Sequence, residues 1–191
     1  WPSDNTDPIE RLFIQWGFSQ VFPAKTMCAH VTTWNKNSSV KFRTDVAMMC
    51  KLGFDIKLAD MSKDDETYCR TAVQNYNRLK PVVLEGDMYR LVSPYGSNHT
   101  STMYVGKDKD KAVVFAFDIH PRYAEKILPV RLQGLDADKM YRVKEINLMP
   151  GANSSLSGNG EVFSGEFLMN VGLNLFTAQQ LNSRVIEVVA E

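Results

Sequence analysis

The sequence predicts an α+β chain, with helices in its first part and antiparallel β structure in the rest. Two observations carry this prediction. Up to about residue 86, apolar residues recur at the three- and four-residue spacing of helices that bury one face. From about Asp87 onward, short runs of β-branched and aromatic residues are separated by turn residues. The change of period predicts two parts, residues 1–86 and residues 87–191.

The N-terminal stretch WPSDNTDPIERL leads straight into the first predicted helix. Asp7 is placed to cap this helix, Pro8 occupies its first position, and Glu10 follows the cap by three residues. One apolar face of the helix consists of Ile9, Leu12, Phe13 and Trp16. Gly17 is expected to end the helix.

A strand and a second helix are predicted next. Residues 26–32 are rich in β formers and predict a strand, which the polar, turn-like loop WNKNSS follows. Residues 42–52 predict a helix that stops at Gly53, and residues 54–56 are expected to be a short connector.

The last predicted helix of the first part begins at Ser62. This residue is a suitable N-cap, and the acidic residues that follow it suit the positive end of a helix dipole. Pro81 is expected to end or bend the helix. The charge run at its start is interpreted as a solvated helix face.

The second part is predicted to be an antiparallel β-sandwich. Runs with strand character cover residues 89–92, 102–105, 112–117, 128–132, 141–146 and 185–189. Residues 167–169 and 173–175 suggest two further strands joined by a tight corner.

Asp4 is the candidate catalytic residue. The capping position explains Asp7, whereas Asp4 lies before the cap on a short turn next to Trp1. If a strand ends just before this turn and the first helix follows it, the turn lies on the face of an α/β barrel that carries the active site.

The same stretch resembles a known family. W-x-S-D-N-T-D-x-I-E-R-L is similar to the acid/base segment of glycoside hydrolase family 36, the retaining α-galactosidases. The segments HVTTW, FRTDVAMMCKLGFDIKL, LEGDMYRLVSP, FLMNVGLNLF and SRVIEVV follow in the family's order. The resemblance implies that residues 1–86 are the C-terminal part of a (β/α)8 catalytic barrel and that residues 87–191 are the C-terminal β-sandwich. It further implies that residues 26–32 are the last strand of the barrel.

The resemblance also implies a reaction. It makes Asp4 the general acid/base of a retaining hydrolysis of terminal α-galactosyl residues in oligosaccharides, by double displacement. Trp1 is a candidate substrate-binding residue that walls the pocket or stacks on a sugar, the alternative being a core residue or chain end. In this family the nucleophile is the Asp of a Lys-Trp-Asp motif, which this sequence lacks. The isolated chain is therefore expected to be inactive.

Composition and charge exclude several other classes. The net charge is zero, which removes the global electrostatic argument for nucleic acid or an anionic membrane. The three cysteines and three histidines form no metal-ligand spacing, so neither a metal site nor a cofactor is expected. The compartment stays open.

Two alternatives stay open. In the first, the β part is a non-catalytic module that binds carbohydrate or protein, with Tyr95, Tyr104, Tyr123 and Tyr141 as the candidate binding residues. In the second, the chain still belongs to an enzyme of this class, but the enzyme prefers N-acetylgalactosamine to galactose. The resemblance also implies that the β part helps to hold a homo-oligomer.

Overall fold

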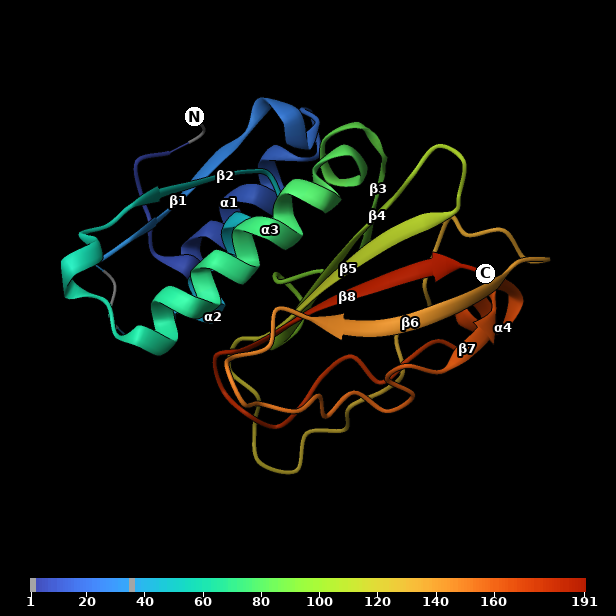
Figure 1. Cartoon of the computed structure of the whole chain (residues 1–191). Coiled ribbons are helices and arrows are strands. Elements are labelled where there is room, and N and C mark those ends of the chain that lie inside the picture. Colours follow the sequence, from blue (N-terminus) through green and yellow to red (C-terminus); the bar gives the residue numbers. More distant parts are fainter. Residues whose placement is uncertain (1–2, 35–36) are drawn as a thin grey trace.

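The computed structural model describes residues 3–34 and 37–191. Figure 1 shows a helical part beside a large twisted sheet. The helices of the first part and the strands between them are α1 (Pro8–Phe18), β1 (Cys28–Thr32), α2 (Val40–Ala47), β2 (Lys51–Asp55) and α3 (Lys63–Glu85). The rest of the chain contains β3 (Asp87–Val92), β4 (His99–Val105), β5 (Lys111–Asp118), β6 (Met140–Ile146), β7 (Val162–Ser164), α4 (Gly165–Asn170) and β8 (Asn182–Ala190).

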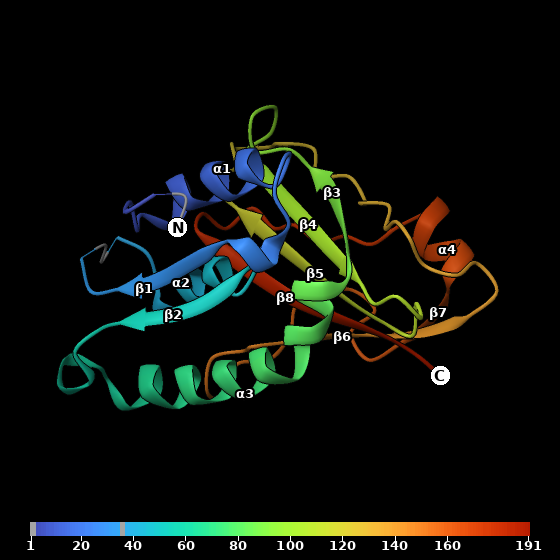
Figure 2. The ribbon, with the colours of Figure 1, turned by 90° about the horizontal axis from the view of Figure 1, so that it is seen from above.

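The large sheet has six antiparallel strands in the order β3-β4-β5-β8-β6-β7. This confirms the antiparallel structure predicted for the second part. Helices α1, α2 and α3 cover one face of the sheet (Figures 1 and 2). Val113, Phe115 and Phe117 of β5 share a core with α2 and α3, whereas Val114 and Ala116 belong to a second core on the other face. Each residue of β5 after Lys111 is buried, as expected for a strand that is covered on both sides.

The layer over that second core is made of loops and α4, within the described residues, in place of a second sheet. Three strand predictions fail here. Residues 128–132 and residues 173–175 contribute only an isolated bridge between Val130 and Leu173. Residues 167–169 lie in α4, because the Ser164 side chain accepts a hydrogen bond from the Phe167 backbone N–H and caps a helix there.

The helical part holds a parallel pair of strands, β1 and β2. This corrects the prediction of a helix over residues 42–52 with a connector after it, since α2 ends at Ala47 and β2 spans the supposed stop at Gly53. The strand over residues 26–32 is followed by a second parallel strand, β2, which contradicts the expectation that it is the last strand of the parallel series.

One other predicted helix end differs from the structure, and of the two alternatives given for Pro81, an end of the helix is excluded. Helix α1 continues through Gly17 to Phe18. Helix α3 contains Pro81 and continues to Glu85. Leu79, Val82 and Val83 around the proline are buried, and their packing offsets the hydrogen bond that Pro81 cannot donate.

Candidate active site

The candidate site lies at one end of the helical part. The segment before α1 and the carboxyl ends of β1 and β2 lie at the same end of the molecule in both ribbon views (Figures 1 and 2). Carboxyl ends of parallel strands are where α/β folds place their active sites. The geometry therefore brings the segment that contains Asp4 to the expected edge.

Asp7 caps the helix start through one carboxylate oxygen. Its Oδ1 accepts hydrogen bonds from the backbone N–H groups of Ile9 (2.9 Å) and Glu10 (3.0 Å), which confirms the predicted N-cap. The backbone N–H of Asp7 donates to Oδ1 of Asn5 at 2.8 Å. These bonds fix the chain on the helix side of Asp4.

Asp4 lies in a bend and is exposed. The segment around it is fastened to β1 at two points. Thr6 and Thr32 share a hydrogen bond between their hydroxyl groups at 3.0 Å. Arg11 donates to the backbone carbonyls of Ser3 (3.2 Å) and Cys28 (3.0 Å). Asp4 is thus an accessible carboxyl on a segment that is held on both sides.

The helix face that sequence patterning predicted is only partly correct. Arg11 and Gln15 are each 3% exposed and lie on the buried side of α1 with Leu12, whereas Ile9 and Phe13 are half-buried. Gln15 donates to the Val46 carbonyl at 3.1 Å. No periodic signal marks these two polar residues, because a charged or amide side chain in a helix is normally solvent-exposed. Burial lowers the pKa of the Arg11 guanidinium below its usual value.

One face of the parallel pair is polar. Ala29 and Val31 of β1 are buried in the core beneath the strands, so Cys28, His30 and Thr32 lie on the opposite face. In the parallel register His30 is paired with Gly53, and Thr32 is paired with Asp55 at the end of β2. The sequence prediction placed Asp55 in a connector; the structure instead puts this exposed carboxylate at the same edge as Thr32.

Two further candidates from the sequence have different outcomes. Trp1 lies outside the described residues. Of the tyrosines proposed for a binding module, Tyr104 and Tyr141 are buried in the core and Tyr95 and Tyr123 are exposed.

The three cysteines are free, with Cys50 and Cys69 buried, and burial raises the pKa of Cys50 to about 12.

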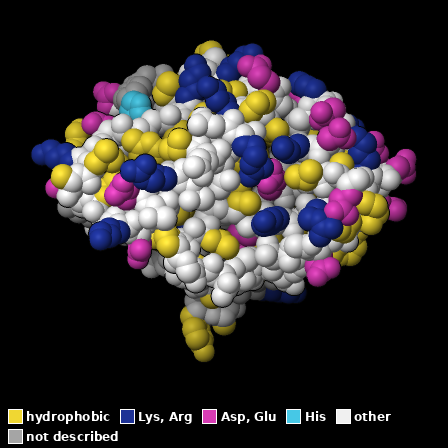
Figure 3. All heavy atoms as spheres, viewed as in Figure 1, with side chains coloured by type: hydrophobic (Ala, Val, Ile, Leu, Met, Phe, Trp, Pro, Cys, Tyr) yellow, Lys and Arg dark blue, Asp and Glu magenta, His cyan; other side chains and the backbone are white. Residues whose placement is uncertain are grey.

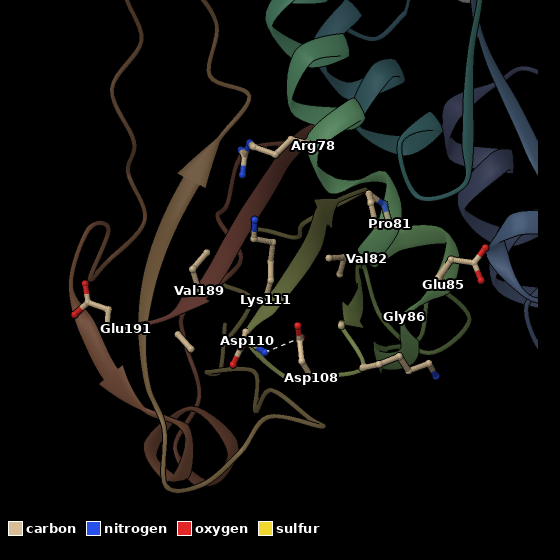
Figure 4. Close-up of a pocket in the computed structure, with 13 residues that line it drawn as sticks. Arg78, Pro81, Val82, Glu85, Gly86, Asp108, Asp110, Lys111, Val189 and Glu191 are labelled. Atoms are coloured by element: carbon tan, nitrogen blue, oxygen red, sulfur yellow. Dashed lines mark hydrogen bonds between the residues drawn. The ribbon is translucent and has the colours of Figure 1, made fainter.

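A separate hollow lies elsewhere, between the end of α3, the β4–β5 turn and the end of β8 (Figure 4). It measures about 750 Å³, and charged side chains of both signs line it. Two of the lining carboxylates form ion pairs with residues nearby, Asp110 with Lys139 (2.6 Å) and Glu191 with Arg142 (2.5 Å). Positive and negative side chains are also interspersed over the face seen in Figure 3.

Within the described residues, no group of three or more His, Cys, Asp or Glu side chains is placed to hold a metal ion. No helix in this part of the chain has the length and apolar character to cross a membrane.

Comparison with known proteins assigns the chain to a family. The family model described as Melibiase matches residues 1–86, and the model for the glycosyl hydrolase family 36 C-terminal domain matches residues 99–188. Alpha-galactosidase 2 of Hypocrea jecorina is 34% identical over 192 residues, which cover 97% of this chain and 24% of that protein.

The chain belongs to glycoside hydrolase family 36. Solved family 36 structures superpose on all of it. A variant of the GH36 alpha-galactosidase AgaA from Geobacillus stearothermophilus, in complex with stachyose, has a TM-score of 0.87 at 29% identity. Another AgaA variant, in complex with raffinose, has a TM-score of 0.86 at 27% identity. The chain covers 26% of each of these family 36 structures, so it spans about a quarter of its relatives.

Proposed function

We propose that this chain belongs to a retaining α-galactosidase in which Asp4 is the general acid/base. The enzyme would hydrolyse terminal α-galactosyl residues of oligosaccharides by double displacement. The observation that carries the proposal is the position of Asp4, exposed on a segment fastened to β1 at the carboxyl edge of a parallel pair, in a chain of family 36. The position of Asp7 is explained by the helix cap, in which its Oδ1 accepts from two backbone N–H groups.

The chemistry requires two carboxyl groups about 5–5.5 Å apart. In the first step the nucleophile forms a bond to the anomeric carbon, the glycosidic C–O bond breaks, and Asp4 gives its proton to the leaving oxygen. In the second step the oxygen of a water molecule forms a bond to the anomeric carbon, the bond to the nucleophile breaks, and Asp4, now ionised, takes a proton from that water. Asp4 therefore faces the glycosidic oxygen and the leaving group.

We further propose that residues 1–86 complete a (β/α)8 barrel and that residues 87–191 form its C-terminal β domain, arranged as a sandwich whose second layer is largely loops. The parallel pairing of β1 with β2 supports the barrel, since parallel strands occur in sheets covered on both faces. The polar face that carries His30 would then line the barrel interior. Trp1 would help to form the sugar pocket, and the β domain would contribute to a homo-oligomer.

Raffinose and stachyose, which are bound in two of the related structures, represent the proposed substrate class. Both carry a terminal α-galactosyl group. The nucleophile is proposed to lie in another part of the same protein, so the isolated chain should not turn over either sugar.

Release of galactose from raffinose tests the proposal. The full-length protein that carries this chain should be active, and Asp4→Asn should lower kcat/KM by about 10²–10⁴-fold, because the leaving oxygen loses its proton donor. Asp7→Asn is the matched control. Asparagine caps helices as well as aspartate does, so this variant should stay within a few-fold of wild type.

Equal losses in the two variants would remove Asp4 from its proposed role. The isolated chain, assayed in parallel, should release no galactose. Turnover by the isolated chain that Asp55→Asn abolished would instead show that the second carboxylate lies within these residues.

A further inference from the structure

Trp34 is a large aromatic residue in an unusual position. It lies directly beyond the carboxyl end of β1, in the loop that leads to α2, and 76% of its surface is exposed. A tryptophan side chain normally buries a large apolar area, so an indole held in solvent gives up a substantial contribution to folding. Exposed aromatic side chains at the edge of a site commonly serve binding.

Both ends of the loop are anchored. Thr32 is 2% exposed, shares its hydroxyl hydrogen bond with Thr6, and accepts a hydrogen bond at its carbonyl from Arg43. At the other end the Ser39 side chain accepts from the Phe42 backbone N–H at 3.1 Å and caps α2. Trp34 therefore lies two residues after Thr32, which is hydrogen-bonded to the segment that contains Asp4.

A hollow of about 320 Å³, lined by polar side chains and by Val31, Val40, Ile56 and Met61, lies at the foot of this loop. Thr33 and Ser38, from the two sides of the loop, line it together with Arg43, Asp60 and Asp65. Within the described residues, the Ser38 hydroxyl oxygen is buried without a hydrogen-bond partner. Hydroxyl groups, carboxylates and a guanidinium are the groups that bind the hydroxyls of a sugar.

We propose that Trp34 is a stacking platform for the leaving-group sugars of the substrate. This rests on the proposed function. The acid/base gives its proton to the leaving oxygen, so residues farther out on the same edge meet the leaving group rather than the galactosyl ring. The apolar face of a pyranose ring packs on an indole.

The test uses a series of α-galactosides with leaving groups of increasing size. In the full-length protein, Trp34→Ala should lower kcat/KM by an amount that grows from methyl α-galactoside through melibiose to raffinose and stachyose. The loss for the two longest should be about five- to tenfold and appear mainly in KM, because stacking acts on bound substrate and transition state alike. Trp34→Phe keeps an aromatic face and should recover part of this loss.

Phe22→Ala is the matched control. Phe22 is also exposed, at 46%, but it follows the opposite end of α1, so its removal should leave the whole series unaffected. A Trp34→Ala loss that is the same for every leaving group, or absent, would overturn the proposal while the wild-type protein still released galactose. A wild-type protein that released galactose from none of these sugars would instead refute the proposed function.

Discussion

Asp45 shows how a single residue joins the two parts of the chain. It is fully buried, and its Oδ1 accepts from the Tyr68 hydroxyl (2.8 Å) and from Asn147 (3.1 Å). Its Oδ2 accepts from Lys41 (2.5 Å) and from the Ser183 hydroxyl (2.7 Å). Burial, with Asp45 adding to it, raises the pKa of Tyr68 well above its usual value, so the phenol stays protonated and able to donate.

Removal of the Asp45 carboxylate should strongly lower the free energy of unfolding. Asp45→Ala leaves Lys41 and the other buried donors without their acceptor, and we expect a loss of about 3–5 kcal/mol in the free energy of unfolding. Urea unfolding of the 191-residue chain measures it. Asp64→Ala, at an exposed position in the first turn of α3, should cost at most about 1 kcal/mol. Similar costs for the two variants would contradict the role given to the buried network.

At the residue scale, the sequence predicts what is local. The caps at Asp7 and Ser62 depend on neighbours three residues away, and the structure confirms both. Arg11 was missed because its partners are the carbonyls of Ser3 and Cys28, which only the folded chain brings together. Nothing in the spacing of Arg11 distinguishes it from a solvated arginine.

At the scale of elements, Gly53 explains why the structure has a strand where the sequence predicted the end of a helix. The His30 side chain on β1 lies across Gly53 on β2, so a Cβ at Gly53 would come within 2.2 Å of His30 Cδ2. A glycine after an apolar, methionine-rich run is typical of a helix end. Here the glycine gives room to a neighbouring strand, a contact that the local sequence does not contain.

A double-mutant cycle tests this explanation. Gly53→Ala should destabilise the chain by about 1–3 kcal/mol, because the added methyl displaces the imidazole. In a His30→Ala background the same substitution should cost clearly less, which gives a coupling energy of about 0.5–3 kcal/mol from the urea midpoints. Additive effects would mean that the two side chains do not compete for this space.

At the scale of the whole molecule, the two parts share one core. Residues of α2 and α3 pack with Phe115 and Phe117 of the large sheet. The antiparallel part was predictable because its short runs of β formers are separated by the usual turn residues, and because some strands, such as β6, alternate apolar with polar residues. The number of sheets was not, since loops and α4 cover the second face with side chains whose positions depend on long-range packing.

The chain covers about a quarter of its relatives, and β1 and β2 form a sheet of only two parallel strands within the described residues. Such a pair is normally part of a larger parallel sheet. This agrees with the proposal that Asp4 works with a carboxylate from another part of the protein.

The most direct measurement is the reaction of the full-length Asp4→Asn variant in the presence of azide. An activated aryl galactoside needs little acid assistance, so the variant should still form the covalent galactosyl intermediate, and azide needs no general base to attack it. The account predicts that azide accelerates turnover and that α-galactosyl azide is the product, with raffinose hydrolysis still impaired. Raffinose hydrolysis close to wild type, or a β-galactosyl azide, would contradict it.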